Sequence, residues 1–295
     1  MNYVDDKKVA ELEIKANDIR QSIIEMLVAA GSGHSAGPLG MADVFTALYF
    51  HLLRHDPKNP ALPERDFVIL SNGHICPVQY ATMAHAGYFP VEELKTLRKF
   101  GSRLQGHPHR TKLPGIEASS GPLGTGISQA VGMALALRMD KKTNFVYALM
   151  GDGEQDCGIV WEAIMLAGRE QLWNLIGIID RNNIQIDGFT EDIMPLEPLR
   201  EKYESFGWHV IDVDGHNIEE IVNAVSEAKA IYEKPKMIIA HTIPGKGVDF
   251  MERRFEWHGN PPGKGPTDTV PADKQAAEAL HELRTLRGRI KGEHE

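Results

Sequence analysis

The chain has 295 residues, which is enough for one large α/β domain or two average ones. Hydrophobic residues make up 42% and charged residues 25%, as in an ordinary soluble globular protein. The formal net charge is −9 and no basic face stands out, so the composition argues against nucleic-acid binding.

The sequence also argues against a signal peptide, a membrane span and a disulfide scaffold. The N-terminus is charged, unlike a signal peptide, and no apolar run reaches the roughly 18 residues that a membrane span needs. The chain has only two cysteines, Cys76 and Cys157, far apart and without metal-ligand spacing. We therefore expect a cytoplasmic protein with no disulfide scaffold and no membrane partner.

The first elements that the sequence predicts are helical. Apolar residues recur at three- and four-residue steps from Val9 to Met26, which indicates an amphipathic helix. This helix should end at the glycine-rich stretch 31–40, because glycine adopts unusual backbone dihedrals without steric penalty. A second helix should begin near Ala42.

Apolar runs then alternate with helical stretches along the rest of the chain. Strands are predicted at 67–70, 144–150, 174–180, 208–213 and 236–242, and helices at 126–139, 157–171, 196–206 and 217–233. This alternation indicates an α/β fold, with a central mostly parallel sheet and helices on both faces. No repeat or linker divides the chain, so we predict a single domain, 1–295. Its helical C-terminal tail should start at about residue 272 and extend into solvent.

The segment GDGEQDCGIVWEA, residues 151–163, directly follows a predicted strand. Its Asp152 carboxylate is a good ligand for Mg²⁺, and the flanking glycines would let a phosphate approach the backbone. A tight turn with a solvated aspartate would be the simpler interpretation of GDG alone. However, Asn182 follows 30 residues later, after one helix and one strand, so adjacent parallel strands would bring the two side chains together. The backbone carbonyl of Ile184 could add a third oxygen. This is the spacing of the thiamine-diphosphate motif.

Other phosphate-binding motifs do not match. The glycine-rich segments 31–37 and 122–130 lack the G-x-G-x-x-G pattern of dinucleotide-binding folds. Segment 258–266 contains GKG, whereas a Walker A loop has GK followed by Ser or Thr. Nicotinamide and nucleotide-triphosphate enzymes are therefore disfavoured.

Four histidines lie in predicted loops or at element ends, each close to a glycine: His34, His74, His107 and His258. A lone histidine is usually structural. Four in this setting indicate a ligand site, because neutral imidazoles can donate to phosphates and hydroxyls and transfer protons near pH 7. Seven others lack this setting and are interpreted as structural or surface residues: His51, His55, His85, His209, His216, His241 and His281.

Several segments, taken in order, resemble one known family. They are SGHSAGPLGMADVFTALYF, LSNGHICPVQYA, GHPH, ASSGPLGTGISQAVGMALA, MGDGE, DRNNIQIDG, VDGHN and EWHG. This series is similar to the N-terminal, diphosphate-binding domain of transketolases, and the resemblance spans roughly residues 10 to 265. It implies the thiamine-diphosphate-binding fold, with thiamine diphosphate and Mg²⁺ as cofactors; Ca²⁺ or Mn²⁺ could replace Mg²⁺.

The same resemblance implies a role for individual residues. Asp152, Asn182 and the Ile184 carbonyl would hold the metal. Gly121, Pro122 and Leu123 would flank the cofactor. Its diphosphate would be contacted by Gly153, His74 and His258, its thiazolium side by Ile186, and Lys246 would lie nearby. His34, His107 and His258 match positions that face the ketose hydroxyls and the reacting carbonyl.

The chain departs from the family pattern in two ways. Transketolases are usually more than twice as long, and the additional part binds the aminopyrimidine ring and holds the glutamate that activates the cofactor. The chain therefore resembles the N-terminal subunit of a split transketolase, whose partner carries the pyrimidine-binding domain in an α2β2 heterotetramer. In addition, Cys157 stands where the family often has a glutamate that links the two active sites; Asp156 could replace it from one position earlier.

The resemblance implies transfer of a two-carbon ketol unit between sugar phosphates. One alternative is the α subunit of a 2-oxo-acid dehydrogenase or decarboxylase, which shares the GDG and Asn motif but does not need histidines for sugar hydroxyls. A deoxyxylulose-phosphate synthase agrees less well with GHPH and GPLGTGIS. A non-catalytic subunit that only binds cofactor would not need the complete metal and histidine sets.

Overall fold

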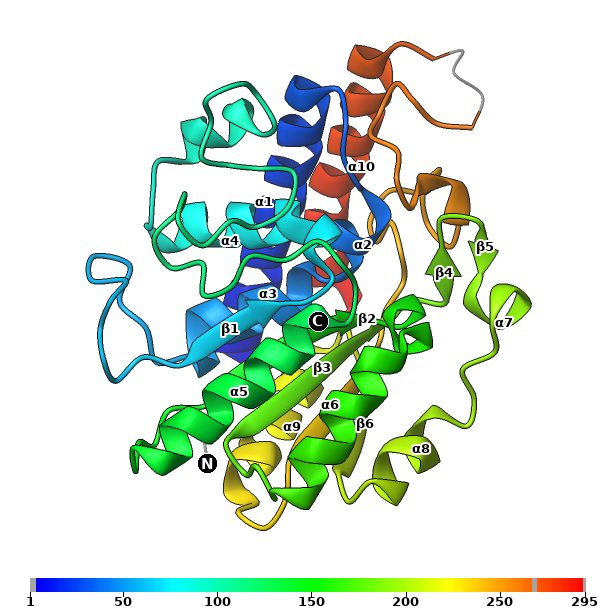
Figure 1. The fold of residues 1–295 in the computed structure, drawn as a ribbon. Coiled ribbons are helices and arrows are strands. Elements are labelled where there is room, and N and C mark those ends of the chain that lie inside the picture. The colour runs from blue at the N-terminus through cyan, green and yellow to red at the C-terminus, as the bar shows by residue number, and fades with distance from the viewer. Residues whose placement is uncertain (1–3, 267–269, 294–295) are drawn as a thin grey trace.

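A five-stranded parallel sheet forms the centre of the protein, in a computed structural model that describes residues 4–266 and 270–293, with side chains up to residue 285 (Figure 1). The strand order is β1-β2-β3-β7-β6, and every pair is parallel. The strands are β1 (Phe67–Leu70), β2 (Val146–Gly151), β3 (Leu175–Arg181), β6 (His209–Asp214) and β7 (Lys236–His241). All residues of β3, the central strand, are buried, as expected for a parallel sheet covered on both faces.

Helices cover both faces of this sheet, as the sequence predicts. On one face pack α5 (Thr125–Met139), α6 (Gly158–Arg169) and α8 (Leu199–Ser205). On the other pack α1 (Asp6–Ala30), α3 (Ala42–Ala47), α4 (Cys76–Ala86), α9 (Ile218–Ala230) and α10 (Ala272–Glu293). None of the helices in the described ranges has both the length and the apolar character that crossing a membrane requires.

Shorter elements lie mainly at the carboxyl ends of the strands and in the connections. They are α2 (Ala36–Gly40), α7 (Thr190–Ile193), a π-helical turn (Leu48–Leu52), four 3₁₀ turns (Gly73–Ile75, Val91–Thr96, Gly153–Asp156, Phe255–Trp257), and the antiparallel hairpin of β4 (Ile184–Gln185) and β5 (Gly188–Phe189).

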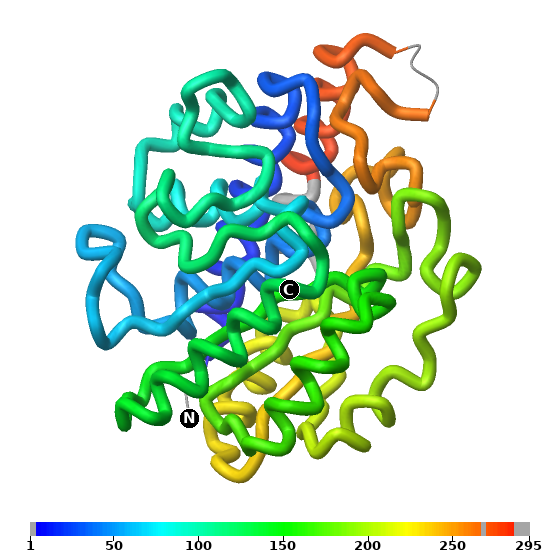
Figure 2. Tube along the Cα trace, in the orientation of Figure 1, coloured from blue at the N-terminus to red at the C-terminus, as the bar shows by residue number. Residues whose placement is uncertain are grey.

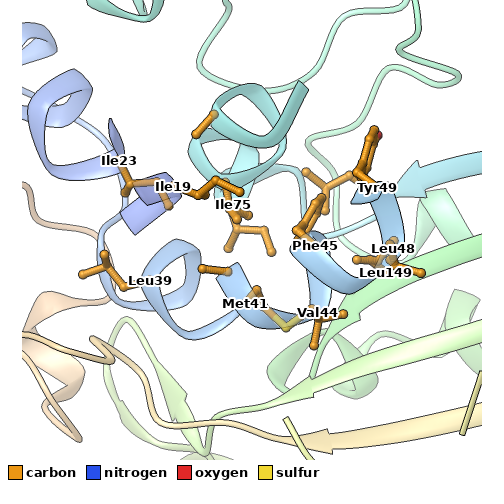
Figure 3. Packing of buried hydrophobic residues seen from close by; sticks show 14 of the residues in the cluster. Ile19, Ile23, Leu39, Met41, Val44, Phe45, Leu48, Tyr49, Ile75 and Leu149 are labelled. Carbon is orange, nitrogen blue, oxygen red and sulfur yellow. The ribbon is translucent and has the colours of Figure 1, made fainter. Parts of the chain in front are cut away.

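The first helix is defined at both ends by caps that the sequence supplies. The Asp5 side chain accepts a hydrogen bond from the Lys8 backbone N–H at 2.7 Å, and Gly31 ends the helix in the left-handed conformation, at φ 61°. Ile19 and Ile23 of α1 are fully buried and pack against the α2–α3 segment, where Figure 3 shows them near Leu39.

The expected strands and the four helices between them are confirmed, but the tail differs from the prediction. Ala272–Glu293 form α10, so the helix begins at the predicted residue, but it packs along α1 instead of extending into solvent; Figure 2 shows these two helices side by side. Ala279 and Leu283 are fully buried there, and the Asn17 amide donates to the Leu283 carbonyl at 2.8 Å. The sequence reasoning also missed α4 and the β4–β5 hairpin.

A buried ion pair connects α1 to α3. The Arg20 guanidinium donates to both carboxylate oxygens of Asp43, and its Nε donates to the Leu39 carbonyl at 3.0 Å. His216 Nε2 accepts the Ile243 N–H at 2.7 Å, so its Nδ1 carries the proton that is donated to Asp43 at 2.7 Å. Burial raises the pKa of Asp43, but Arg20 and His216 outweigh burial and hold the pKa at about 2.

Asp43→Asn should therefore destabilise the fold strongly. The substitution keeps the shape but leaves the Arg20 charge buried without a counter-ion, which costs about 3–5 kcal/mol. Because the folded pKa of Asp43 is below its ordinary 3.8, the pair stabilises fully above pH 3.8, and this contribution is lost as the pH falls towards 2. Urea unfolding at neutral pH measures the change. Glu11→Gln, at an exposed pair with Lys8, is the matched control and should cost less than about 1 kcal/mol. Equal effects would contradict a stabilising role for the buried pair.

Candidate functional site

A cavity of about 450 Å³ opens at the carboxyl edge of the sheet, where the loops after β1, β2 and β3 meet. Ligands of such sheets bind at this edge. The lining residues are His34, Asn72, His74, His107, Gly121, Leu123, Gly151, Asp152, Gly153, Glu154, Asp180, Asn182, Ile184, Gln185, Ile186, Asp187 and His258. Segments far apart in sequence therefore form one site.

The four histidines singled out from the sequence all line this cavity. His34 lies between α1 and α2, His74 in the turn after β1, and His258 just after the turn 255–257. The ring centroids of His34 and His74 are 4.8 Å apart, and His258 lies 5.5 Å from His34 and 5.2 Å from His74. The structure thus places three imidazoles in contact, with His107 on the same wall.

These imidazoles are held in the neutral form. Burial, followed by the charges of His258, Arg98 and His107, lowers the pKa of His34 to about 3, and burial lowers the pKa of His258 to about 4. Burial also lowers the pKa of His74 and His107. At neutral pH each ring has one N–H donor and one acceptor nitrogen. The Nδ1 atoms of His34 and His258 are buried and have no hydrogen-bond partner within the described residues.

The predicted metal ligands also come together. Gly151 pairs with Asp180 in the register of β2 and β3, which places Asp152 next to the segment that begins at Asn182. Asp152 Oδ2 accepts the Asn183 N–H at 2.6 Å and an Arg181 N–H at 3.2 Å, while Oδ1 accepts the Gly153 N–H at 2.7 Å. Asn182 Nδ2 donates to Asp180 at 2.7 Å.

Within the described ranges no three His, Cys, Asp or Glu side chains form a metal-ligand group, so a metal here would need amide and backbone oxygens.

Two charged residues beside these ligands were not singled out from the sequence. Burial, opposed by hydrogen bonds from Thr242 and Asn182 and reinforced by the nearby Asp152 charge, raises the pKa of Asp180 to about 7. The Arg181 side chain is only 4% exposed and pairs with three carboxylates: Asp152 at 3.2 Å, Glu191 at 2.6 Å and Glu197 at 2.9 Å. Arg181 therefore holds in place both the Asp152 carboxylate and the segment that follows the β4–β5 hairpin.

Two further residues that line the cavity, Glu154 and Asn72, were not selected from the sequence. Each lies two residues from one that was, Asp152 or His74. Buried Glu154 accepts hydrogen bonds from the Ser71 hydroxyl and from the backbone N–H groups of Gly124 and Gly151, at 2.6 Å and 3.1 Å. It thereby joins three loops of the cavity. Asn72, two residues before His74, is 1% exposed, and both atoms of its amide have no partner among the described residues. An unsatisfied buried amide in a cavity wall is suited to a polar ligand.

The remaining sequence-selected residues divide into two groups. Gly121, Leu123, Gly153, Ile184 and Ile186 line the cavity, whereas Pro122 and Lys246 are not among its lining residues. Lys246 Nζ lies 3.9 Å from Glu252. Cys157 is half-buried at the start of α6, and neighbouring Asp156 accepts a hydrogen bond from Gln185 at 3.1 Å.

Comparisons with known proteins agree with this geometry. Residues 12–276 match the family model described as transketolase, thiamine diphosphate binding domain. The 6-deoxy-6-sulfo-D-fructose transketolase subunit SqwG of Clostridium sp. is 48% identical, covering 84% of this chain and 90% of that protein. An apulose-4-phosphate transketolase subunit of Phocaeicola vulgatus is 40% identical, covering 94% of this chain and 95% of its own.

Longer relatives match over part of their length. Human transketolase is 38% identical, covering 90% of this chain but 42% of its own. The crystal structure of Pichia stipitis transketolase with sedoheptulose-7-phosphate superposes with a TM-score of 0.82 at 33% identity, covering 96% of this chain and 46% of that one. The chain thus spans less than half of these longer proteins.

The buried neutral histidines should make the folded state less stable as the pH falls. Each has a folded pKa below its ordinary 6.5, so the unfolded chain takes up protons first, and stability falls as the pH drops from 6.5 towards 4. His34→Gln and His258→Gln should each reduce proton uptake on unfolding by about one in this range. Urea unfolding at several pH values measures the slope. A slope equal to that of the wild type would mean that these imidazoles are not held neutral by burial.

Proposed function

This chain belongs to the transketolase family, and we propose that it is the N-terminal subunit of a two-chain transketolase. The complete enzyme would transfer a two-carbon ketol unit from a ketose phosphate to an aldose phosphate. The observation that carries the proposal is that neutral His34, His107 and His258 line the same cavity as Asp152 and Asn182. Similarity to relatives that are named as transketolase subunits, and that match over 90% and 95% of their own length, supports the two-chain form.

The lining residues suit a diphosphate bound through a divalent cation. Asp152, Asn182 and the Ile184 carbonyl offer the hard oxygen ligands that Mg²⁺ prefers, and Ca²⁺ or Mn²⁺ could replace it. The Asn72 amide and the Nδ1 atoms of His34 and His258 have no hydrogen-bond partner among the described residues, which leaves these polar atoms for a ligand. When bound, thiamine diphosphate supplies the electron sink for carbon–carbon cleavage.

The residues of this chain would bind, orient and transfer protons. Gly153, His74 and His258 would contact the diphosphate, and the cofactor's neighbours would be Gly121, Pro122, Leu123, Ile186 and Lys246. His34, His107 and His258, as neutral groups, would donate hydrogen bonds to the ketose hydroxyls and accept or return a proton at the reacting oxygen. Binding each sugar in a single orientation lowers the entropic part of the activation barrier.

The partner subunit would supply the pyrimidine-binding domain and its activating glutamate. Glu154, the glutamate among the described residues that line the cavity, is already engaged by Ser71, Gly124 and Gly151, and it lies two residues after Asp152. An α2β2 heterotetramer would then contain two active sites. The free state of Cys76 and Cys157 supports a cytoplasmic location, where sugar phosphates of the pentose phosphate pathway would be the substrates.

The rival functions have less support. A 2-oxo-acid dehydrogenase subunit would not need four histidines at one cavity, and the relatives that cover most of this chain are named as transketolase subunits. A non-catalytic subunit would not need polar atoms left free in the cavity wall.

Asp152→Asn should weaken Mg²⁺-dependent binding of thiamine diphosphate. The substitution removes the charge of a proposed metal ligand but preserves the shape of the side chain. The loss of cofactor affinity should therefore exceed the roughly 10- to 100-fold effect of removing a residue that only hydrogen-bonds to a metal ligand. Calorimetric titration of the folded variant measures it. Asp187→Asn, at a second carboxylate of the same cavity, is the control and should change affinity little. Unchanged affinity in Asp152→Asn would exclude the proposed metal site.

The function itself is tested by reconstitution. The isolated chain should show little ketol transfer, because the pyrimidine ring would lack its binding domain, and adding the partner should restore transfer and tighten cofactor binding. A coupled ketose–aldose assay measures activity, and light scattering measures the size of the complex. Full turnover by this chain alone would contradict the two-chain proposal.

A further inference from the structure

Arg181 is a buried cation that the proposed reaction does not use. Its side chain is only 4% exposed, and it directly precedes Asn182, one of the proposed metal ligands. Among the described residues, it is the only Lys or Arg that forms an ion pair with a residue lining the cavity of about 450 Å³. The molecule therefore has a fixed positive charge beside the proposed metal site.

The Asp152 carboxylate is held mainly through one of its two oxygens. Its Oδ2 accepts the Asn183 N–H at 2.6 Å and an Arg181 N–H at 3.2 Å, and the Thr190 hydroxyl donates to it at 3.4 Å. Oδ1 accepts one hydrogen bond among the described residues, from the Gly153 N–H at 2.7 Å. Because a carboxylate oxygen has two lone-pair sites, Oδ1 keeps one for a further ligand. Arg181 therefore acts on such a ligand through its charge and not by occupying the same lone pair.

Arg181 is also bound by residues 188–198, which we call the arm and which Figure 1 shows passing from β5 through α7 towards α8. Its Nη2 donates to Glu191 at 2.6 Å and to Glu197 at 2.9 Å. Both distances are shorter than the 3.2 Å between Arg181 and Asp152. The side chains of the two glutamates are 41% and 57% exposed. The arm thus holds the guanidinium from the solvent side.

These charges act in opposite directions on a cation bound at Asp152. Arg181 offsets the charge of the carboxylate and repels the cation, whereas the two arm glutamates offset the charge of Arg181. Because Arg181 is buried and the glutamates are partly in water, solvent and salt screen the glutamates more strongly. An oxygen site holds a divalent cation more tightly as the charge of its ligands increases. The affinity of the site should therefore depend on how well the arm neutralises Arg181.

We propose that Arg181 lowers the affinity of the Asp152 site for its divalent cation, and that the two arm glutamates restore part of that affinity. This inference rests on the proposed metal site and adds a positioning residue that regulates it. When the arm moves away, the full charge of Arg181 acts on Asp152, and the cation is held less tightly. The position of the arm thereby controls how readily the site takes up its metal.

The test is a titration of the full chain with Mn²⁺ in the presence of thiamine diphosphate, with free Mn²⁺ measured by electron paramagnetic resonance. Arg181→Met removes the positive charge but keeps a long side chain, and it should tighten Mn²⁺ binding about 10-fold or more. The double variant Glu191→Gln/Glu197→Gln should weaken Mn²⁺ binding about 3- to 10-fold, because Arg181 loses both exposed counter-charges. Loss of structure would weaken binding in both variants, so effects of opposite sign identify control by charge.

The matched control is Asp192→Asn, which removes an exposed charge of the same arm that does not pair with Arg181. It should change Mn²⁺ affinity less than about 2-fold, as is usual for an unpaired surface charge. Glutamine at 197 keeps an oxygen that can accept the Leu199 N–H, which Glu197 accepts at 2.8 Å. If Arg181→Met fails to fold, the double variant compared with Asp192→Asn still tests the inference.

Unchanged Mn²⁺ affinity in the double variant, weaker binding by folded Arg181→Met, or an equal loss in Asp192→Asn would overturn the inference. The titration needs neither sugar nor partner, so shifts of opposite sign support the inference even if the reconstituted complex transfers no ketol. Conversely, ketol transfer by the wild-type complex together with unshifted Mn²⁺ affinities keeps the proposed function and refutes the inference. A wild-type chain that binds no Mn²⁺, with or without its partner, would refute both.

Discussion

Two carboxylates are buried at the ends of neighbouring parallel strands, and much of the site depends on how their charge is accommodated. Asp152 and Asp180 are each 1% exposed, and burial raises the pKa of both. An uncompensated charge in such a place is costly, so donors must be fixed around it. The structure supplies Arg181, the backbone N–H groups of Gly153 and Asn183, and the Thr242 hydroxyl.

These donors fix the loops as well as the charges. Because Arg181 also binds Glu191 and Glu197, the segment that follows the β4–β5 hairpin is tied to the same carboxylate that ends β2. Glu154 has a corresponding role on the other side, where it joins the end of β1 to the loop before α5. The cavity is therefore shaped by buried polar contacts, whose loss would leave unpaired charges.

The features that could be predicted from the sequence are those that depend on local residue patterns. Apolar strands and the Asp152–Asn182 spacing are visible in the letters, and parallel pairing then brings strand ends together. The packing of α10 on α1 was not predictable, since its contacts join residues as distant as Asn17 and Leu283. Arg181 was missed for a similar reason, because its partners lie on two other segments, one after β2 and one after the β4–β5 hairpin.

The distribution of charge also explains why the proposed cofactor would need a metal. The main cavity is lined by Asp152, Glu154, Asp180 and Asp187, while none of its lining residues is Lys or Arg. Its histidines are kept neutral by burial, so they can donate hydrogen bonds to a diphosphate but cannot neutralise it. Arg181 is buried and already shared among three carboxylates. A diphosphate could therefore approach these acids only with a cation between them, and Asp152 and Asn182 are the ligands that we propose for that cation.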